Sequence, residues 1–277
     1  MRNKSIFSLL AFMVGVLLPD LCWAAPQRIV SLTPSNTEIL FAIGLGPRVV
    51  GDTTYCDYPP AARKLPKVGD YQTSIEKVIA LRPDLVVADS LLNHTAIAQL
   101  KRLHIPLYTF HADSLSQLYA GITGLGRVTG RVAAAQSLVH RMKADMARIA
   151  AIVGKEHFRP KVLYIVQINP LWVAGPDTIT NELIGLAGGI NVAANSSPGY
   201  HPYSPELVVA DNPDVIIVSN RDVGQVQRPG WEGIRAIKDH AVCGINSDII
   251  SRTGPRLVIA LRQLARLLHP NAFKKQR

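Results

Sequence analysis

The sequence predicts an α/β protein of two similar Rossmann-like lobes, joined by one long rigid helix, with a ligand cleft between the lobes. Three observations support this fold class. Apolar strand-like runs alternate with helical stretches, parts of the first half recur in the second, and a long helical pattern separates the two copies. The 277 residues are 48% hydrophobic and 18% charged, which is enough apolar material for a sizeable core. This composition excludes a disordered chain and a small disulfide-stapled domain.

The first 24 residues have the layout of a secretory signal peptide. Arg2 and Lys4 form a positive start, and residues 6–18 are an apolar run of 13 residues. That run is too short to cross a bilayer as a helix. Small residues follow it, so we expect a signal peptide over residues 1–24 with cleavage after Ala24. The mature protein is then expected to be soluble and exported.

Short apolar runs separated by helical stretches predict the strands of parallel sheets. These runs are Arg28–Leu32, Val49–Gly51, Leu85–Ala88, Leu107–Phe110, Val162–Val166 and Val215–Val218. The first run leads into residues 33–36, whose Thr-Pro-Ser-Asn sequence is typical of a helix start. Ligands of such sheets bind at the carboxyl ends of the strands, so we expect the ligand between the two lobes.

The sequence contains two internal similarities in the same order. Residues 74–88, SIEKVIALRPDLVVA, match residues 204–218, SPELVVADNPDVIIV, without gaps. Each copy predicts a Ser cap, an acidic first turn, a short apolar helix and a buried strand. The second similarity joins the TEIL of residues 37–40, followed by a Gly at 44, to the NELI of residues 181–184, followed by a Gly at 188. Two ordered similarities indicate two related lobes.

The longest helical pattern lies between the two copies. Its apolar residues recur every three or four positions at Val132, Ala135, Val139, Met142, Met146, Ile149 and Val153. From Thr129 to Val153 such a helix is about 37 Å long. It would act as a strut that resists hinge closure, although an ordinary core helix fits the same pattern. The expected division is a signal peptide (1–24), an N-terminal lobe (25–127), a linking helix (128–154) and a C-terminal lobe (155–277).

The sequence carries no pattern that marks a catalytic or metal site. It lacks a G-x-S-x-G elbow and an H-E-x-x-H motif, and its eight histidines are isolated. The glycine pairs at 44 and 46 and at 124 and 126 do not complete a nucleotide loop, and we interpret both as turns after helices. The net charge of +10 is carried by scattered residues, which disfavours nucleic acid. We predict no enzyme activity, with an α/β enzyme or a structural surface protein as the alternatives.

Aromatic residues in Gly- and Pro-rich loops are the candidates for ligand binding. They are Tyr55, Tyr71, Trp172 and Tyr200. Such side chains offer flat apolar surfaces with a polar edge, suited to a large planar or macrocyclic ligand, although they can also anchor loops to a core. Asp248 and Arg252 could add polar contacts from the second lobe, or could form a local ion pair.

The stretches RIVSLTPSNTEILFAIGLGPRVVG and TTYCDYPPAARKLPKVGDYQTSIEKVIALRPDLVVA resemble the N-terminal lobe of class III periplasmic binding proteins. NELIGLAGGINVAA and YSPELVVADNPDVIIV are similar to their second lobe, so the resemblance spans the mature chain. That family serves ABC importers of cobalamin, haem and iron–siderophore complexes. The resemblance implies a monomeric solute-binding protein without a catalytic cofactor, which delivers its ligand to a permease and its ATPase.

Within this family the chain most resembles the cobalamin-binding (vitamin B12-binding) members. There, aromatic side chains of both lobes enclose the corrinoid, at positions similar to Tyr55, Tyr71, Trp172 and Tyr200. The segment around Asp248 and Arg252 resembles their second-lobe ligand loop, except that Ile249 and Ile250 replace bulky aromatics. Cobalamin is therefore the first expectation. A haem or iron–siderophore complex is the alternative, and the positive net charge favours such an anionic chelate.

Two further pairs of residues have expected roles. Glu76 and Glu206 occupy matching positions in the repeat and resemble the lobe-surface carboxylates that dock onto arginines of the permease, although a first-turn Glu also stabilises its helix dipole. Export leaves Cys56 and Cys243 in an oxidising compartment, where they are candidates for a disulfide or for two unpaired thiols.

Overall fold

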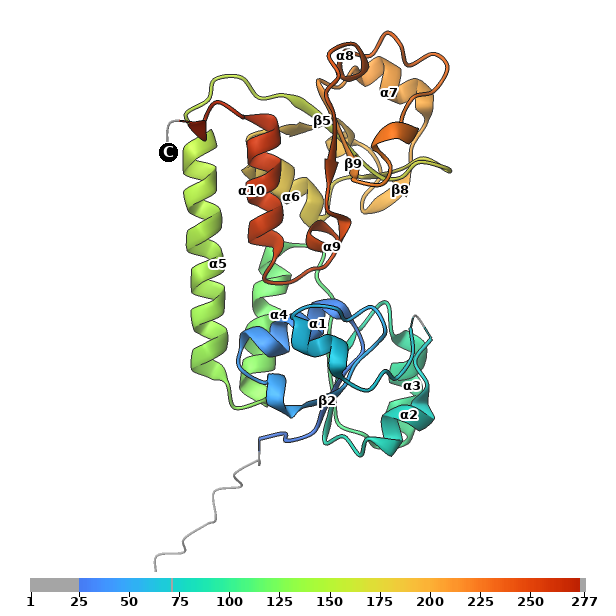
Figure 1. Cartoon of the computed structure of the whole chain (residues 1–277), viewed down its shortest axis with the longest axis vertical. Coiled ribbons are helices and arrows are strands. Elements are labelled where there is room, and N and C mark those ends of the chain that lie inside the picture. Colours follow the sequence, from blue (N-terminus) through green and yellow to red (C-terminus); the bar gives the residue numbers. More distant parts are fainter. Residues whose placement is uncertain (1–24, 71, 275–277) are drawn as a thin grey trace, which may run out of the picture.

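A four-stranded parallel sheet forms the centre of the N-terminal lobe (Figure 1). The computed structural model describes residues 25–70 and 72–274, so the predicted signal peptide lies outside the described residues. The strand order is β2 (Val49–Gly51), β1 (Ile29–Ser31), β3 (Leu85–Asp89) and β4 (Leu107–Phe110). Alternate residues of β1 pack into two separate apolar clusters, Ile29 into one and Val30 into the other. Both faces of the sheet are therefore buried, which explains the continuous apolar runs in the sequence.

Three α-helices connect the strands of this lobe, and a side chain caps the first two of them. They are α1 (Pro34–Ala42), α2 (Ile75–Ala80) and α3 (His94–Arg102), with short 3-10 segments at Gly46–Arg48 and Pro60–Lys64. The Thr33 side chain accepts a hydrogen bond from the backbone N–H of Asn36, and Ser74 does the same for Lys77. These caps satisfy backbone donors that the first helical turn cannot pair.

A six-stranded mixed sheet forms the centre of the C-terminal lobe. Its strand order is β10 (Val242–Ile245), β9 (Val215–Ser219), β5 (Lys161–Gln167), β6 (Trp172–Ala174) and β8 (Tyr200–Pro202), and β7 (Ile190–Asn191) also pairs with β5. β6 and β8 add an antiparallel edge to an otherwise parallel sheet. The assignment of Trp172 and Tyr200 to loops is wrong, because both lie on this edge. Three-residue strands among Gly and Pro give no visible period in the sequence.

The remaining helices complete the C-terminal lobe. They are α6 (Ile179–Leu186), α7 (Pro205–Asp211), α8 (Arg235–Lys238), α9 (Ser247–Ile250) and α10 (Leu257–Leu268), with 3-10 segments at Val192–Asn195 and Val223–Gln225. Across the described part of the chain, no helix combines the length and apolar character that a membrane span requires. The two-lobe α/β architecture predicted from the sequence is confirmed.

Helix α5 (Val132–Val153) runs along both lobes (Figure 1). It contacts α4 (Leu115–Val128) and, in the C-terminal lobe, α6 and α10. Its buried residues are Ala135, Leu138, Met142, Met146, Ile149 and Val153. They belong to one apolar core that extends from Ile29 of β1 to Leu268 of α10. A continuous core between the lobes resists their relative motion, because opening it would expose apolar surface to water.

A glycine permits the close contact between α4 and α5. The interpretation of Gly124 and Gly126 as a turn is wrong, because both lie within α4. A Cβ atom on Gly126 would lie 2.4 Å from the Cβ of Ala135 and 3.1 Å from the carbonyl oxygen of Arg131. The turn comes later, at Gly130, whose φ of 69° is in the left-handed region.

The candidate disulfide is not formed. Cys56 is buried in the N-terminal lobe, where its thiol forms hydrogen bonds with the hydroxyls of Thr37 and Thr53. Cys243 lies on β10 of the C-terminal lobe. Both cysteines are free thiols, Cys56 in the loop after β2 of one lobe and Cys243 on a strand of the other.

We expect Gly126→Ala to lower the free energy of unfolding by about 1–3 kcal/mol, because the added methyl group overpacks the contact between α4 and α5. Gly185→Ala in α6 is the matched control, since its Cβ meets nothing within 4 Å. That substitution should stabilise the protein by up to about 1 kcal/mol through helix propensity. Urea denaturation measures both changes, and equal stability of the two variants would contradict the packing argument.

Candidate functional site

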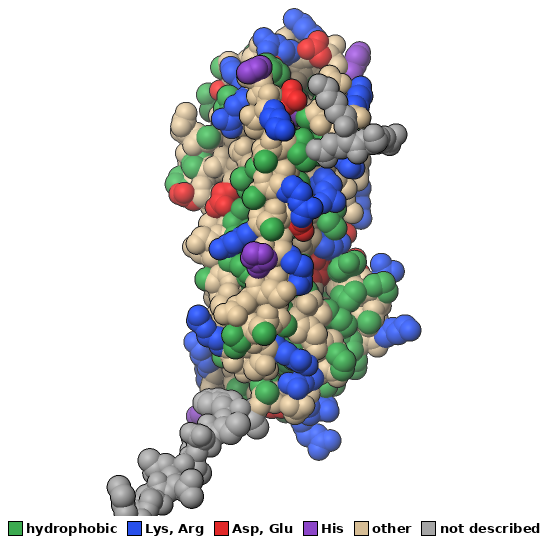
Figure 2. Space-filling model, turned by 90° about the vertical axis from the view of Figure 1, so that its left-hand side faces the viewer, with side chains coloured by type: hydrophobic (Ala, Val, Ile, Leu, Met, Phe, Trp, Pro, Cys, Tyr) green, Lys and Arg blue, Asp and Glu red, His purple; other side chains and the backbone are tan. Residues whose placement is uncertain are grey.

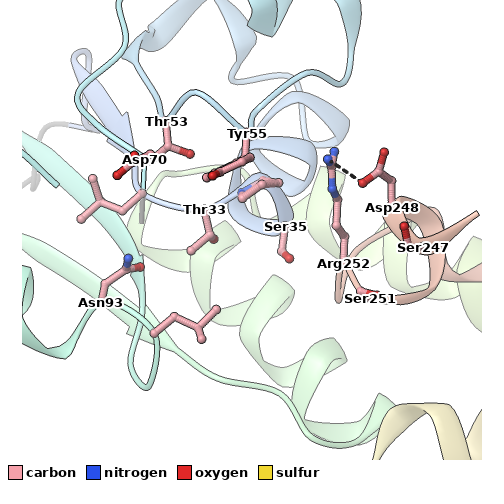
Figure 3. Close-up of a pocket in the computed structure, with 13 residues that line it drawn as sticks. Thr33, Ser35, Thr53, Tyr55, Asp70, Asn93, Ser247, Asp248, Ser251 and Arg252 are labelled. Atoms are coloured by element: carbon pink, nitrogen blue, oxygen red, sulfur yellow. Dashed lines mark hydrogen bonds and ion pairs between the residues drawn. The ribbon is translucent and has the colours of Figure 1, made fainter. Parts of the chain in front are cut away.

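A cleft between the two lobes is the candidate ligand site (Figure 3). Its volume is about 450 Å³. The N-terminal lobe supplies Leu32, Thr33, Pro34, Ser35, Thr53, Tyr55, Asp70, Leu92 and Asn93, and the C-terminal lobe supplies Ser247, Asp248, Ser251 and Arg252. Most of the polar groups are hydroxyls, together with one amide, two carboxylates and one guanidinium group.

Parallel strands bring the N-terminal residues of this cleft together. Thr33 follows the end of β1, Thr53 follows β2 and Asn93 follows β3. Because the carboxyl ends of parallel strands meet at one edge of a sheet, the three side chains face the same space. Asn93 is held by a hydrogen bond of 2.9 Å, in which its side-chain oxygen accepts from the backbone N–H of Asp89.

Arg252 reaches the cleft from the segment between α9 and α10. Its guanidinium group lies 2.5 Å from a carboxylate oxygen of Asp57, 3.1 Å from Asp248 and 3.5 Å from Glu38. Figure 3 shows the bond to Asp248 at the wall of the cleft. Partial burial raises the pKa of Asp57, but the charge and hydrogen bond of Arg252 outweigh this effect and lower that pKa overall. Arg252 is thus a cation that neighbouring carboxylates already neutralise.

Glu38 is the centre of the ion cluster that joins the lobes. It lies on α1 of the N-terminal lobe and is only 3% exposed. Arg256, at the start of α10, donates to it through two nitrogens at 2.5 and 2.8 Å, and Arg252 is the second cation. The guanidinium group of Arg256 also lies 4.4 Å from the ring centroid of Tyr58. A buried carboxylate requires such partners, because an unpaired charge inside a protein is strongly unfavourable.

Glu182 of α6 matches Glu38 in the internal repeat and also contacts the other half of the chain. Its carboxylate accepts a hydrogen bond of 3.2 Å from the backbone N–H of Leu115, the first residue of α4. Both glutamates lie in the internal repeat of the sequence, but the repeat alone predicts no role for them. The signal was an acidic residue within an apolar helical stretch, which is rare unless the charge is paired.

The structure brings together three of the six predicted ligand-binding residues. Tyr55, Asp248 and Arg252 line the cleft. Tyr71 lies outside the described residues. Trp172 and Tyr200 do not line this cleft but lie on the neighbouring strands β6 and β8. The Tyr200 hydroxyl lies 3.0 Å from that of Thr180, so this side chain is held in place.

Glu76 and Glu206 occupy equivalent exposed places on α2 and α7. The hydroxyl of Ser74 donates to Glu76 at 2.9 Å, and the hydroxyl of Ser204 donates to Glu206 in the same way. These bonds, together with bonds from the glutamates' own backbone N–H groups, lower the pKa of both carboxyls. In Figure 1, α2 and α7 lie on the side of the molecule away from α5. Each lobe therefore presents one ionised carboxylate on the same side.

Within the residues that the structure describes, no group of three His, Cys, Asp or Glu side chains could hold a metal ion. The densest candidate is His111, whose ring nitrogens lie 2.8 Å from Asp89 and 3.1 Å from Asp113. Partial burial lowers the pKa of His111, but its hydrogen bond to Asp89 and the two negative charges raise it overall. This histidine bridges two carboxylates at the carboxyl edge of the N-terminal sheet.

Comparison with known proteins gives consistent matches. A family model described as "periplasmic binding protein" matches residues 29–249. YvrC, an ABC transporter substrate-binding lipoprotein of Bacillus subtilis (strain 168), is 37% identical over 259 residues, which cover 90% of this chain and 82% of YvrC. The vitamin B12-binding protein of Salmonella choleraesuis (strain SC-B67) is 32% identical over 256 residues, which cover 91% of this chain and 93% of that protein.

One solved structure also resembles this chain over most of its length. The periplasmic haem-binding protein RhuT from Roseiflexus sp. RS-1, in its apo form, superimposes with a TM-score of 0.80 at 30% identity. The match covers 89% of this chain and 99% of that chain. Proteins named for cobalamin and for haem are thus about equally close, so similarity alone does not select the ligand.

We expect Glu38→Gln to lower the free energy of unfolding by about 3 kcal/mol, because it removes the buried counterion of Arg256 and one of the three carboxylates around Arg252. Glu156→Gln is the matched control, since Glu156 is exposed and forms no ion pair among the described residues. Urea denaturation measures both variants. If they unfold at the same urea concentration, the ion cluster does not hold the lobes together.

Proposed function

Since this chain belongs to the periplasmic binding protein family, we propose that it captures cobalamin and delivers it to the permease of an ABC importer. The family consists of substrate-binding proteins, so the cleft is a place of capture and release rather than of catalysis. The predicted signal peptide at residues 1–24 would direct the mature protein to the periplasm. The choice of ligand rests on one observation, which is the kind of polar groups that line the cleft.

The cleft wall favours a large neutral ligand over an anionic one. Its polar groups are mainly hydroxyls, with the amide of Asn93. Arg252 is already matched by Asp57 and Asp248, and the carboxylate of Asp70 adds a further negative charge. A propionate or an anionic chelate would have to displace these carboxylates or lie beside them, which is unfavourable. The peripheral amides of cobalamin can instead exchange hydrogen bonds with hydroxyls.

The net charge of +10 does not argue for an anionic ligand, because the excess positive charge lies away from the cleft. Among the cleft-lining residues, Arg252 is balanced against Asp70 and Asp248. Tyr55 of the cleft wall would supply apolar contact to the corrin ring, and a ligand that extends beyond this cleft would also reach Trp172 and Tyr200 on the neighbouring strands β6 and β8.

Haem is the second candidate because RhuT is close and because Tyr55 lines the cleft. Haem requires an axial ligand from the protein, and a tyrosine oxygen is one of the groups that serve. Cobalamin brings its own lower axial ligand and makes no such demand. An iron–siderophore complex would meet the same cleft carboxylates as haem.

Glu76 and Glu206 are proposed to dock onto arginines of the permease. Each lobe presents one such carboxylate on the side away from α5. Two charges held at a fixed spacing suit a two-fold symmetric partner, because both can pair only when the lobes have the right separation.

We expect isothermal titration of the mature protein with cyanocobalamin to give saturable one-to-one binding. The triple variant Tyr55→Ala/Trp172→Ala/Tyr200→Ala should bind roughly 100-fold more weakly, because each aromatic contact is worth about 1 kcal/mol. Phe158→Ala is the control, since this exposed aromatic lies after α5. Tight binding of haem or of a ferric siderophore without binding of cyanocobalamin would replace cobalamin as the ligand.

We expect Glu76→Arg/Glu206→Arg to abolish uptake of labelled cobalamin in cells while leaving the affinity in the titration unchanged. Charge reversal places two cations against the arginines of the permease. Glu156→Arg/Asp239→Arg changes the net charge equally at two other exposed positions and should preserve uptake. Normal uptake by the first variant would remove the docking role of both glutamates.

A further inference from the structure

The basic residues are scattered along the sequence, but the fold gathers the excess positive charge on α4, α5, α10 and the segment that follows α10. Residues 25–70 and 72–274 contain 26 Lys or Arg and 19 Asp or Glu, an excess of seven positive charges. The ranges 115–155 and 257–274, which hold α4, α5, α10 and the following segment, contain nine basic residues and one acidic residue. Their excess is eight, so the rest of the described chain has a net charge of −1.

Three of these cations form a row along α5. Arg141, Arg148 and Lys155, at the end of the helix, are all exposed and follow one another at intervals of seven residues. Seven residues make almost two helical turns, so Arg141 and Arg148 lie on one stripe of α5, about 10 Å apart, and Lys155 follows two residues after the helix ends. Figure 2 looks at this side of the molecule and shows Lys and Arg side chains along its whole height, with few Asp or Glu.

Helix α10 adds two arginines beside the row. Arg148, Arg262 and Arg266 surround a pocket of about 210 Å³ between α5 and α10, and Asp145 is its one carboxylate. Asp145 pairs with Arg148 at 2.5 Å, and Arg266 lies 5.7 Å from the ring centroid of Phe273. Arg262 forms no ion pair with any residue that the structure describes. Cations gathered around a single carboxylate repel one another, and a bound anion would relieve this repulsion.

We propose that these five residues, Arg141, Arg148, Lys155, Arg262 and Arg266, form a basic face that binds an extended polyanion. The fitting partner is a glycopolymer that carries carboxylate, phosphate or sulfate groups along its chain. The row spans about 20 Å, which exceeds what one small anion can contact. Repeating negative charges on a flexible chain match its regular spacing, and their counterions would be released on binding.

A polymer suits this face better than a lipid bilayer does. The apolar side chains exposed between the cations of the row on α5 are those of Ala144, Ala147 and Ala151, and the exposed large apolar side chains nearest to the face in sequence are the single residues Ile259 and Phe158. A helix that inserts into a bilayer surface instead carries large apolar residues beside its cations. Because α2 and α7 lie on the opposite side of the molecule, Glu76 and Glu206 stay accessible while the basic face is occupied (Figure 1).

The test measures binding of the mature protein to immobilised dextran sulfate, with uncharged dextran as the reference, over a range of NaCl concentrations. Arg141→Gln/Arg148→Gln/Lys155→Gln should weaken binding at least tenfold at low salt. It should also reduce the slope of log K against log salt concentration by about two, because three contacts no longer release counterions. Lys64→Gln/Lys101→Gln/Arg102→Gln removes the same charge from exposed positions of the N-terminal lobe and should bind as the parent does.

Three results would overturn the proposal: no binding to dextran sulfate, equal weakening by both triple variants, or an effect of the α5 variant only on vesicles of phosphatidylglycerol and phosphatidylcholine. The second result would mean that binding depends only on the net charge of the protein. The third would mean that the basic face binds a membrane surface instead. Thermal unfolding of each variant, followed by circular dichroism, separates a loss of binding from a loss of fold. The affinity for cyanocobalamin is measured separately, so a failure of this proposal leaves the proposed transport function untouched.

Discussion

The buried carboxylate of Glu38 determines how the two lobes meet. It lies in the N-terminal lobe, while both of its cationic partners, Arg252 and Arg256, come from the C-terminal lobe. A charge removed from water must keep its counterions, so this one contact fixes the approach of α1 to the start of α10. It also holds Arg252 against Asp57 at the wall of the cleft. The shape and the near-neutral charge of the cleft both depend on this cluster.

The apolar core along α5 supports the same arrangement by a different force. Helix α5 packs on α4 at one end and on α10 at the other, and the core is continuous between the lobes. The ion cluster is directional and sensitive to single substitutions, whereas the core is broad and depends on total buried area. Together they favour a cleft whose shape is set before the ligand arrives.

The sequence predicts those parts of this fold that repeat a simple pattern. Continuous apolar runs predict the parallel strands, and the internal repeat predicts the second lobe. Strands β6 and β8 are not predictable in this way, because three residues are too few to show a period. Gly126 resembles a turn residue, yet it serves a helix contact that only the position of Ala135 explains. The roles of Glu38 and Arg256 stay hidden for a similar reason, since they are separated by more than 200 residues.

Glu38 and Glu182 indicate how a duplicated unit became one inseparable molecule. The two residues occupy matching places in the repeat, yet Glu38 pairs with arginines and Glu182 with a backbone N–H group. Each copy has diverged to use a partner that the other half of the chain provides. A lobe on its own would therefore carry a glutamate whose hydrogen-bond or ion-pair partner is missing. Cutting the chain between the lobes would leave Glu38 and Glu182 without the partners that they contact in the whole molecule.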